Sequence, residues 1–361
     1  MIRNTLLSRV VRVLGLSMVP LLALTLSSCG SGGDQPASAD GLTKVRVANS
    51  GMLPASADLA WAIEGGFFEK NGLDVTLNPP QLSASDLAGT VINGDADVAL
   101  VNGTAVPSAR QVGRPLTIVA TTQAPFPLQI AFTPETDKTL REQGLSETSS
   151  VADLLAALKG MTLGTNASGS SITATYRYLL AQYGIDPERD NITLHPMPDV
   201  ASQVAALSHN RVDGLASSLG GAATGAVAQG AGVVWDLTKM KGTEALQAVP
   251  YTNAVTSDAT IKDHPKMIQS FLDALHAAQQ SLLAGLSVED AASLKKLVGS
   301  AMDQKTYDDT IAGMQSLFPK SFSTSGASWD ATCKVAEVNT GESLKIPAAD
   351  AVNNSFVEEV K

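Results

Sequence analysis

The sequence predicts an α/β fold built from two similar halves. Short apolar strands alternate with helical segments along most of the chain, and this alternation favours parallel strand pairing. The chain has 361 residues, which is more than one ordinary core accommodates; 44% of them are hydrophobic and 17% are charged. This composition is typical of a globular protein, and it excludes a disordered chain or a protein with many membrane spans.

The first half contains four predicted strands with helices between them. KVRVAN alternates in polarity as a strand does, and Pro54 at a first turn supports a helix over PASADLAWAIE. The strands are expected at 44–49, 73–77, 97–101 and 115–122, and the helices at 54–64 and 82–93. Ligands of such sheets bind beyond the carboxyl ends of the strands. We therefore expect ligand contacts in the loops 50–52, 102–104 and 122–125.

A second set of strands and helices begins near Ser149. Ser149 or Ser150 suits the N-cap of a helix that ends at Gly160. The strands are expected at 161–165, 191–197, 211–217 and 231–237, and the helices at 170–183 and 199–209. Two such units leave a cleft between them, so we expect two lobes that close on a ligand. After Pro265 the pattern is mostly helical, and these amphipathic helices are expected to pack on the first half as scaffold.

The N-terminus predicts an exported lipoprotein. Arg3, Arg9 and Arg12 precede the apolar stretch 13–26, which is shorter than a membrane span. The next residues, Leu-Ser-Ser-Cys, end at Cys29 and resemble the lipobox of bacterial lipoproteins, whose cysteine receives lipid; a plain signal peptide is the alternative. We expect a signal peptide at 1–28, a lipid-anchored Cys29, a flexible tether at 29–43, and a location in the cell envelope facing the periplasm or the exterior.

Charge and motifs argue against several classes of function. The 25 Lys+Arg against 35 Asp+Glu give a net charge of −10, which disfavours nucleic acid as a partner. The sequence has no Walker A motif, no G-x-S-x-G elbow and no H-E-x-x-H helix, and its four histidines show no metal-ligand spacing. We therefore predict a protein that is not an enzyme and has no catalytic residue, metal or cofactor. A secreted serine hydrolase is the enzymatic alternative.

Six segments, in order, resemble the NMT1/THI5-like, nitrate/sulfonate/taurine-type substrate-binding proteins of ABC importers. They are IEGGFFEKNGLDVTL, INGDADVALVN, LKGMTLGTNASGSS, LLAQYGIDPERDNITL, ALSHNRVDGLAS and KDHPKMIQSFLDALHAA. The resemblance covers about 44–283 and implies a type II periplasmic binding protein, with a hinge and a cleft between two α/β lobes. It implies that lobe one comprises 44–126 and 252–361, and lobe two 127–251. The family also contains pyrimidine-synthesising proteins with a cysteine-rich iron motif, which a chain with 2 cysteines lacks.

The resemblance also implies where a ligand binds. It places the loop 165–171 at the cleft, with the next helix directing its N-terminus at the ligand. The unpaired N–H groups of a first helical turn favour an anionic or acceptor-rich group. The predicted ligand-binding residues are Ser50, Gly51, Met52, Asn102, Gly103, Thr104 and Gln123 in lobe one, and Asn166, Ser168, Ser170, Ser171, Ser217, Ser218 and Leu219 in lobe two.

Several of these residues have a purely structural alternative. Ser170 and Ser171 could serve only as helix caps, and Asn102-Gly103 is a common turn dipeptide. Trp61 is expected in the core. Asp95 and Asp97 are expected to stabilise their turn and face solvent, and are not taken as a metal pair.

The predicted cleft loops contain no Arg or Lys, and this limits the ligand. A doubly charged ligand such as phosphate would need an Arg fork or several donors. We expect a sulfonate, a taurine-like compound, a carboxylate or a related monoanion; a neutral heterocycle such as a pyrimidine precursor is the alternative. The predicted role is that of a monomeric solute-binding component that delivers its ligand to ABC permease and ATPase subunits. A ligand-responsive sensor or adaptor that transports nothing is the alternative role.

Overall fold

The computed structural model describes residues 41–81, 83–167, 169–197 and 199–358. The predicted signal peptide, Cys29, the tether up to residue 40 and Ser168 lie outside the described residues. Within the described ranges, no helix has both the length and the apolar character that a membrane crossing requires.

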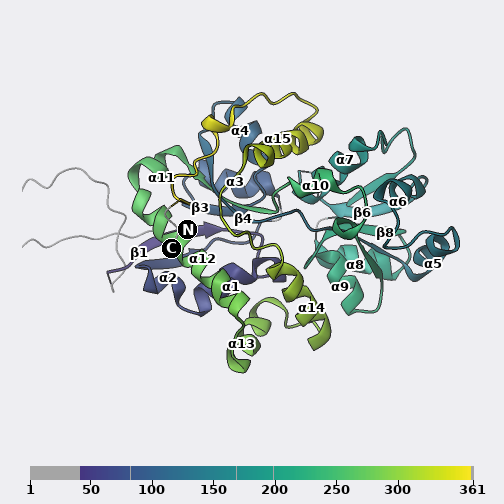
Figure 1. The fold of residues 1–361 in the computed structure, drawn as a ribbon, viewed down its shortest axis with the longest axis horizontal. Helices are drawn as coiled ribbons and strands as arrows, with labels where there is room; N and C mark the ends of the chain where they lie inside the picture. The colour runs from purple at the N-terminus through teal and green to yellow at the C-terminus, as the bar shows by residue number, and fades with distance from the viewer. Residues whose placement is uncertain (1–40, 82, 168, 198, 359–361) are drawn as a thin grey trace, which may run out of the picture. The chain divides into compact units, whose positions relative to one another are not determined.

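Five strands form the first sheet, in the order β2-β1-β3-β10-β4. Figure 1 labels β1, β3 and β4 of this sheet. They are β1 (Thr43–Ala48), β2 (Leu73–Leu77), β3 (Val98–Val101), β4 (Leu116–Gln123) and β10 (Thr252–Ser257). The connecting helices are η1 (Pro54–Ser56), α1 (Ala57–Glu64), α2 (Phe67–Lys70), α3 (Ala84–Ile92) and α4 (Ala105–Gln111). β1 pairs in parallel with β2 and β3, whereas β10 lies antiparallel between β3 and β4.

Five further strands form the second sheet, in the order β7-β6-β8-β5-β9. They are β5 (Leu128–Phe132), β6 (Thr162–Asn166), β7 (Thr193–Met197), β8 (Gly214–Ser218) and β9 (Val233–Asp236). Its helices are α5 (Pro134–Glu142), α6 (Val151–Ala157), α7 (Ser171–Gln182), α8 (Val200–Ser208), α9 (Ala222–Ala228), η2 (Leu237–Lys239) and α10 (Glu244–Gln247). β6 pairs in parallel with β7 and β8, whereas β5 is antiparallel to β8 and β9.

The expected parallel pairing is found among β1, β2 and β3 and among β6, β7 and β8, but both sheets also contain antiparallel pairs and are therefore mixed. The exceptions are β5 and β10, the strands that follow each passage of the chain from one sheet to the other. The two connecting segments run side by side, because the Phe126 N–H donates to the Val249 carbonyl and the Tyr251 N–H donates to the Gln123 carbonyl, both at 2.9 Å. The predicted lobe boundaries remain a proposal; the sheets draw their strands from 43–123 with 252–257, and from 128–236.

The C-terminal region is helical, as predicted. It comprises α11 (Asp258–Asp263), α12 (Pro265–Ala284), α13 (Val288–Val298), α14 (Gln304–Gln315), α15 (Gly326–Thr340) and the short η3 (Ala348–Asp350). α12 packs against α1 and α2, and its Phe271 stacks on Phe68 with ring centroids 5.2 Å apart. This part of the C-terminal region belongs to the core of the first sheet.

Helix α15 departs from the expected scaffold role, because it contacts both halves of the chain. Ala331 and Val335 pack into the apolar cluster that contains α7 of the second sheet. Trp329 and Cys333 pack into a cluster formed by α3, α4 and strands of the first sheet. The two faces of one helix thus join two cores, a contact that its sequence alone did not predict.

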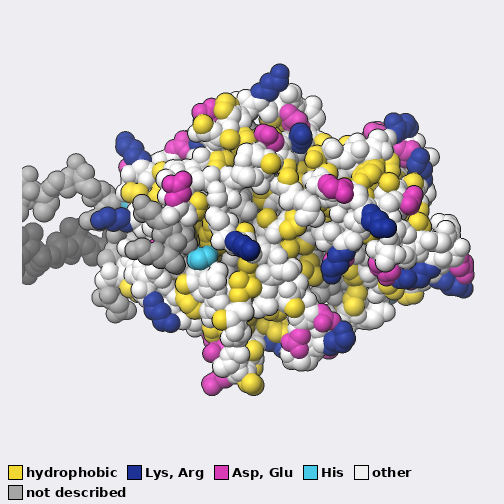
Figure 2. Space-filling view, in the orientation of Figure 1, with side chains coloured by type: hydrophobic (Ala, Val, Ile, Leu, Met, Phe, Trp, Pro, Cys, Tyr) yellow, Lys and Arg dark blue, Asp and Glu magenta, His cyan; other side chains and the backbone are white. Residues whose placement is uncertain are grey.

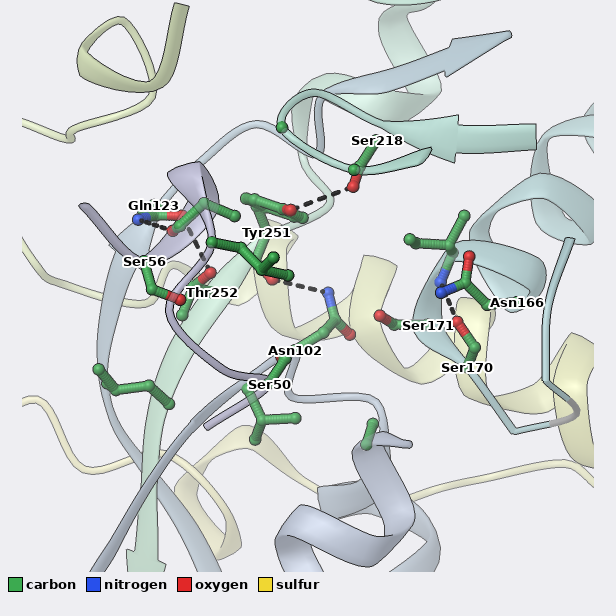
Figure 3. A pocket seen from close by; sticks show the side chains of 18 of the residues that line it. Ser50, Ser56, Asn102, Gln123, Asn166, Ser170, Ser171, Ser218, Tyr251 and Thr252 are labelled. Atoms are coloured by element: carbon green, nitrogen blue, oxygen red, sulfur yellow. Dashed lines mark hydrogen bonds between the residues drawn. The ribbon is translucent and has the colours of Figure 1, made fainter. Parts of the chain in front are cut away.

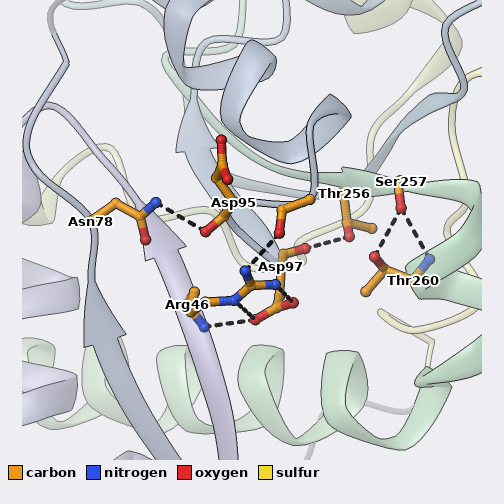
Figure 4. Close-up of polar contacts among 8 residues, drawn as sticks. Arg46, Asn78, Asp95, Asp97, Thr256, Ser257 and Thr260 are labelled. Atoms are coloured by element: carbon orange, nitrogen blue, oxygen red, sulfur yellow. Dashed lines mark hydrogen bonds and ion pairs between the residues drawn. The ribbon is translucent and has the colours of Figure 1, made fainter. Parts of the chain in front are cut away.

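The turn around Asp95 and Asp97 also differs in part from the expectation. Asp95 is exposed, whereas Asp97 is buried beside Arg46 of β1 (Figure 4). The Asp97 carboxylate accepts hydrogen bonds from the Arg46 backbone N–H at 2.8 Å and from Nη2 at 2.8 Å. Asp97 therefore ties the start of β3 to β1 and does not face solvent.

The face shown in Figure 2 carries charges of both signs. Lys and Arg side chains alternate there with Asp and Glu side chains, and the described residues of this face form no continuous basic area. A binding site for a phosphate backbone would require such an area.

Candidate functional site

A cavity of about 130 Å³ lies between the two sheets, where strands of both end. Val101, Gln123, Asn166 and Ser218 line it, and each is the last residue of its strand (β3, β4, β6 and β8, respectively). The carboxyl ends of four strands therefore meet at one site, as expected for sheets of this kind.

Three polar side chains that line the cavity have no hydrogen-bond partner among the described residues. They are Ser50, Asn166 and Ser171 (Figure 3). Ser50 lies two residues after the end of β1, whereas Asn166 ends β6 and Ser171 begins α7. Unpaired hydroxyl and amide groups from both halves of the chain are thus available to a ligand.

The first turn of α7 has a capping side chain and also backbone N–H groups that remain without an acceptor among the described residues. The Ser170 hydroxyl accepts from the Ile172 N–H at 3.2 Å, so Ser170 caps the helix, and it also lines the cavity. The N–H groups of Ser171 and Thr173 have no acceptor among the described residues. A helix start of this kind stabilises an acceptor group by about 0.3–1 kcal/mol.

Asn102 and Ser218 hold the segments that connect the sheets. The Asn102 Nδ2 donates to the Pro250 carbonyl at 2.6 Å, and the Ser218 hydroxyl lies 3.1 Å from the Tyr251 hydroxyl (Figure 3). The Tyr251 ring meets Phe126 edge-on, with centroids 5.1 Å apart. These residues line the cavity and also fix its shape.

A buried carboxylate, Asp58, forms part of the wall on the side of the first sheet. Its exposed fraction is 3%, and Oδ2 accepts hydrogen bonds from Gln279 Nε2 at 2.8 Å and Gln123 Nε2 at 3.1 Å. Burial raises the pKa of Asp58 above its ordinary value, and the hydrogen bonds from Gln279, the Leu59 N–H and Gln123 oppose this shift. The side chain is thus an acceptor held in place by two amides.

The raised pKa of Asp58 predicts a pH-dependent difference between wild type and Asp58→Asn. The folded protein binds this proton more tightly than the unfolded chain, whose pKa is about 4. The contribution to the free energy of unfolding is therefore complete below about pH 4 and is lost as the pH rises through the folded pKa. We expect the stability of wild type minus that of Asp58→Asn, measured by urea denaturation, to fall as the pH rises above about 4. The exposed Asp86→Asn serves as control, and a difference for Asp58→Asn that stays constant with pH would contradict this prediction.

Among the described residues that line the cavity, Asp58 is the only Asp, Glu, Lys, Arg or His. The expected absence of cations from the predicted cleft loops therefore extends to the cavity wall as described. The described part of the chain also contains no group of three or more His, Cys, Asp or Glu residues placed to hold a metal ion.

The turn after β8 closes one rim of the cavity. Gly220 adopts φ +76°, and a Cβ on it would lie 3.2 Å from the Ala55 nitrogen and 3.3 Å from Pro54 Cβ. A glycine is needed here because the backbone is left-handed and because the opposite half of the chain approaches closely. The second sheet thus touches η1 at the edge of the cavity.

Eight of the predicted ligand residues line this cavity. They are Ser50, Asn102, Gln123, Asn166, Ser170, Ser171, Ser217 and Ser218. Among them Ser217 accepts from the Ala223 N–H at 3.2 Å and supports the start of α9. Ser168 lies outside the described residues.

Five other predicted residues do not line it, and their roles as ligand contacts remain predictions. The Gly51 carbonyl accepts from Ser56, and Met52 packs against the core of the first sheet. The Gly103 N–H donates to Asn253, Thr104 lines a separate cavity of about 310 Å³, and Leu219 packs against Gly313 of α14.

Sequence reasoning missed several lining residues. The most important are Asp58, Ser56, Tyr251 and Thr252, and an apolar wall that includes Leu53, Leu59, Leu87, Ile172 and Val200. Pro54 and Asp58 gave a signal, since an acidic residue in the first turn of a helix beside a predicted cleft loop suggests a position near the ligand. Tyr251 and Thr252 were missed because β10 was not predicted, although the resemblance implied a lobe boundary between these two residues.

Comparison with known sequences identifies the family. Residues 41–304, more than half of the chain, match the profile of the NMT1-like family. The chain belongs to this family. Comparison with curated proteins gives no match.

Solved structures show that this NMT1-like chain has the fold of periplasmic binding proteins. The alkanesulfonate-binding protein SsuA of Xanthomonas axonopodis pv. citri, solved with MOPS, aligns with a TM-score of 0.62 and 18% identity over 89% of this chain and 99% of that one. The periplasmic aliphatic sulphonate-binding protein SsuA of Escherichia coli aligns with a TM-score of 0.63 and 17% identity, over 86% of this chain and 92% of that one. A ligand-binding component of an ABC-type import system from Staphylococcus aureus aligns with a TM-score of 0.59 and 14% identity, over 88% of this chain and 99% of that one. The predicted fold class is confirmed.

Proposed function

We propose that the protein is the extracytoplasmic solute-binding component of an ABC importer. In this proposal Cys29 carries the lipid anchor, and the two halves close on a small polar solute that is passed to a permease. The observation that carries the proposal is the cavity at the strand ends, where unpaired Ser50, Asn166 and Ser171 converge from both halves. The family and the named roles of the structural relatives support it.

The volume and wall of the cavity limit the solute. An engineered cavity of about 150 Å³ binds benzene, so a cavity of about 130 Å³ suits a single small ring or a short chain. The start of α7 supports the monoanion that the sequence predicted, whereas the absence of Lys, Arg and His from the wall supports the neutral alternative. Both classes therefore belong in a ligand screen.

The proposal predicts that Asn166→Ala/Ser171→Ala weakens ligand binding with little effect on folding. The screen uses thermal shifts with sulfonates, taurine, nitrate, aromatic carboxylates and pyrimidines; a ligand at a hundred times its Kd adds about 2.7 kcal/mol of stability. Loss of two hydrogen bonds of about 0.5–1.5 kcal/mol each should weaken the ligand about 5- to 150-fold. A strain lacking the gene should regain uptake of this ligand with wild type and much less with the double variant.

Ser170→Ala is the matched control for this experiment. It removes the cap of α7, so it should lower the free energy of unfolding by about 1 kcal/mol, with less effect on affinity than the double variant. An unchanged Kd in the double variant would refute the proposed site. Ligand binding without any role in uptake would favour the sensor or adaptor.

A further inference from the structure

The position of Asp58 bears on the charge of the solute. Its carboxyl group is buried in the wall of a cavity whose described lining residues include no Lys, Arg or His. No ion pair joins Asp58 to a cation among the described residues, and its partners are two amides and one backbone N–H. A second negative charge entering this cavity would meet repulsion, or would require Asp58 to take up a proton.

The surrounding bonds hold Asp58 as an acceptor. Gln123 Nε2 and Gln279 Nε2 both point to Oδ2, and Gln279 Nε2 also donates to the Thr122 carbonyl at 2.9 Å. Gln123 is fixed in turn, because its Oε1 accepts from the Thr252 hydroxyl at 3.0 Å. The negative end of this network therefore stays beside the cavity when a solute enters.

We infer that Asp58 makes the cavity select against anions, so that the solute has a net charge of zero or above. This inference rests on the proposed solute-binding function and adds the charge class of the ligand. A donor group or a cationic group of the solute would face the Asp58 and Gln123 side, and an acceptor would face the start of α7. In Figure 3 Gln123 lies on one side of the cavity, and Asn166 and Ser170 lie on the other.

The unpaired N–H groups at the start of α7 are compatible with such a solute. A carbonyl oxygen or a ring nitrogen can also accept a hydrogen bond from the N–H groups of a helix start, with less stabilisation from the helix dipole than an anion receives. A neutral molecule with a donor at one end and an acceptor at the other therefore satisfies both walls without placing a negative charge beside Asp58.

An isosteric series of probes tests this inference. Benzoate, benzamide and benzamidinium share a six-membered ring, which suits the volume of the cavity, and differ in charge. Calorimetric titration at pH 7.5 should give wild type at least about tenfold lower affinity for benzoate than for benzamide. Asp58→Asn, which keeps the size of the side chain, should narrow this ratio at least about tenfold.

Asp86→Asn is the control for the effect of removing any negative charge near the cavity on its electrostatic potential. Asp86 is exposed in the first turn of α3, whose Ala84 and Leu87 line the cavity, and removing its charge should change the ratio less than about twofold. The ratio of two affinities does not respond to a general loss of binding, so a merely structural role of Asp58 would leave it unchanged.

Each other outcome overturns the inference. If the wild-type protein bound benzoate as tightly as benzamide, the inference would be refuted. This comparison uses the wild-type protein alone and does not depend on whether a variant folds. If Asp58→Asn and Asp86→Asn changed the ratio of the two affinities equally, the selectivity would come from the overall negative charge of the protein and not from Asp58. If none of the three probes binds, the inference about this pocket fails. In that case an anion found in the wider ligand screen would leave the proposed function intact, whereas a screen without any ligand would remove both.

Discussion

Ser171→Trp should abolish ligand binding while leaving the protein folded. Ser171 is the first residue of α7, its side chain has no partner among the described residues, and it lies at the cavity (Figure 3). An indole is larger than the benzene that fills a cavity of about 150 Å³, so it should occupy the whole space of about 130 Å³. Affinity should fall more than about a hundredfold, which removes about 2.7 kcal/mol of binding free energy.

The measurement is the thermal shift or calorimetric titration with the solute that the wild type binds. Ser170 stays in place as the cap, so the unliganded variant should lose less than about 1 kcal/mol of stability. Val288→Trp is the matched control, because Val288 is also the first residue of its helix and is 90% exposed. Retained affinity in Ser171→Trp would show that the solute binds elsewhere.

Among the variants proposed for this protein, Trp235→Ala should cause the largest loss in the free energy of unfolding. Trp235 is fully buried in β9, its ring meets Phe132 edge-on at 5.6 Å, and its Nε1–H donates to Asp137 Oδ1 at 2.7 Å. Removing a buried tryptophan costs about 3–5 kcal/mol through lost contacts and the cavity left behind. The loss is comparable with the whole stability of a marginal protein.

Urea denaturation followed by far-UV circular dichroism measures this effect without relying on tryptophan fluorescence. Trp235→Phe is the control, because it retains an aromatic ring and removes the bond to Asp137, so it should cost clearly less than the alanine variant. A loss below about 1 kcal/mol for Trp235→Ala would mean that the second sheet does not depend on this packing.

Much of the fold could be predicted from local pattern. β2 was predicted at its observed bounds, and the helix beginning at Ser171 was predicted to within one residue. These elements have clear periodicity and strong ends, such as the cap at Ser170. β5 and β10 were missed because each pairs only with strands from distant parts of the chain, and this partnership leaves no periodic signal.

The candidate site was partly predictable for a similar reason. The family resemblance found Asn166 and Ser171, and the rule that ligands bind at the carboxyl ends of strands found Gln123; all three line the cavity. Neither the strand-end rule nor the resemblance found Asp58, because the burial of this residue depends on Gln123 and on Gln279 of α12, which lie far along the chain. A helical run that contains Trp61 was expected to form core, and it does, but one face of the same segment also reaches the cavity.

The position of α15 has a mechanical consequence. Because this helix packs on α7 with Ala331 and Val335 and on the first-sheet cluster with Trp329 and Cys333, it is a third connection between the halves. In the proposed opening of the two halves, α15 would slide along one of these two faces, so the movement would combine rotation at the connecting segments with shear between packed helices. For the solute-binding function proposed above, the apolar contacts of α15 would limit how far the halves can part.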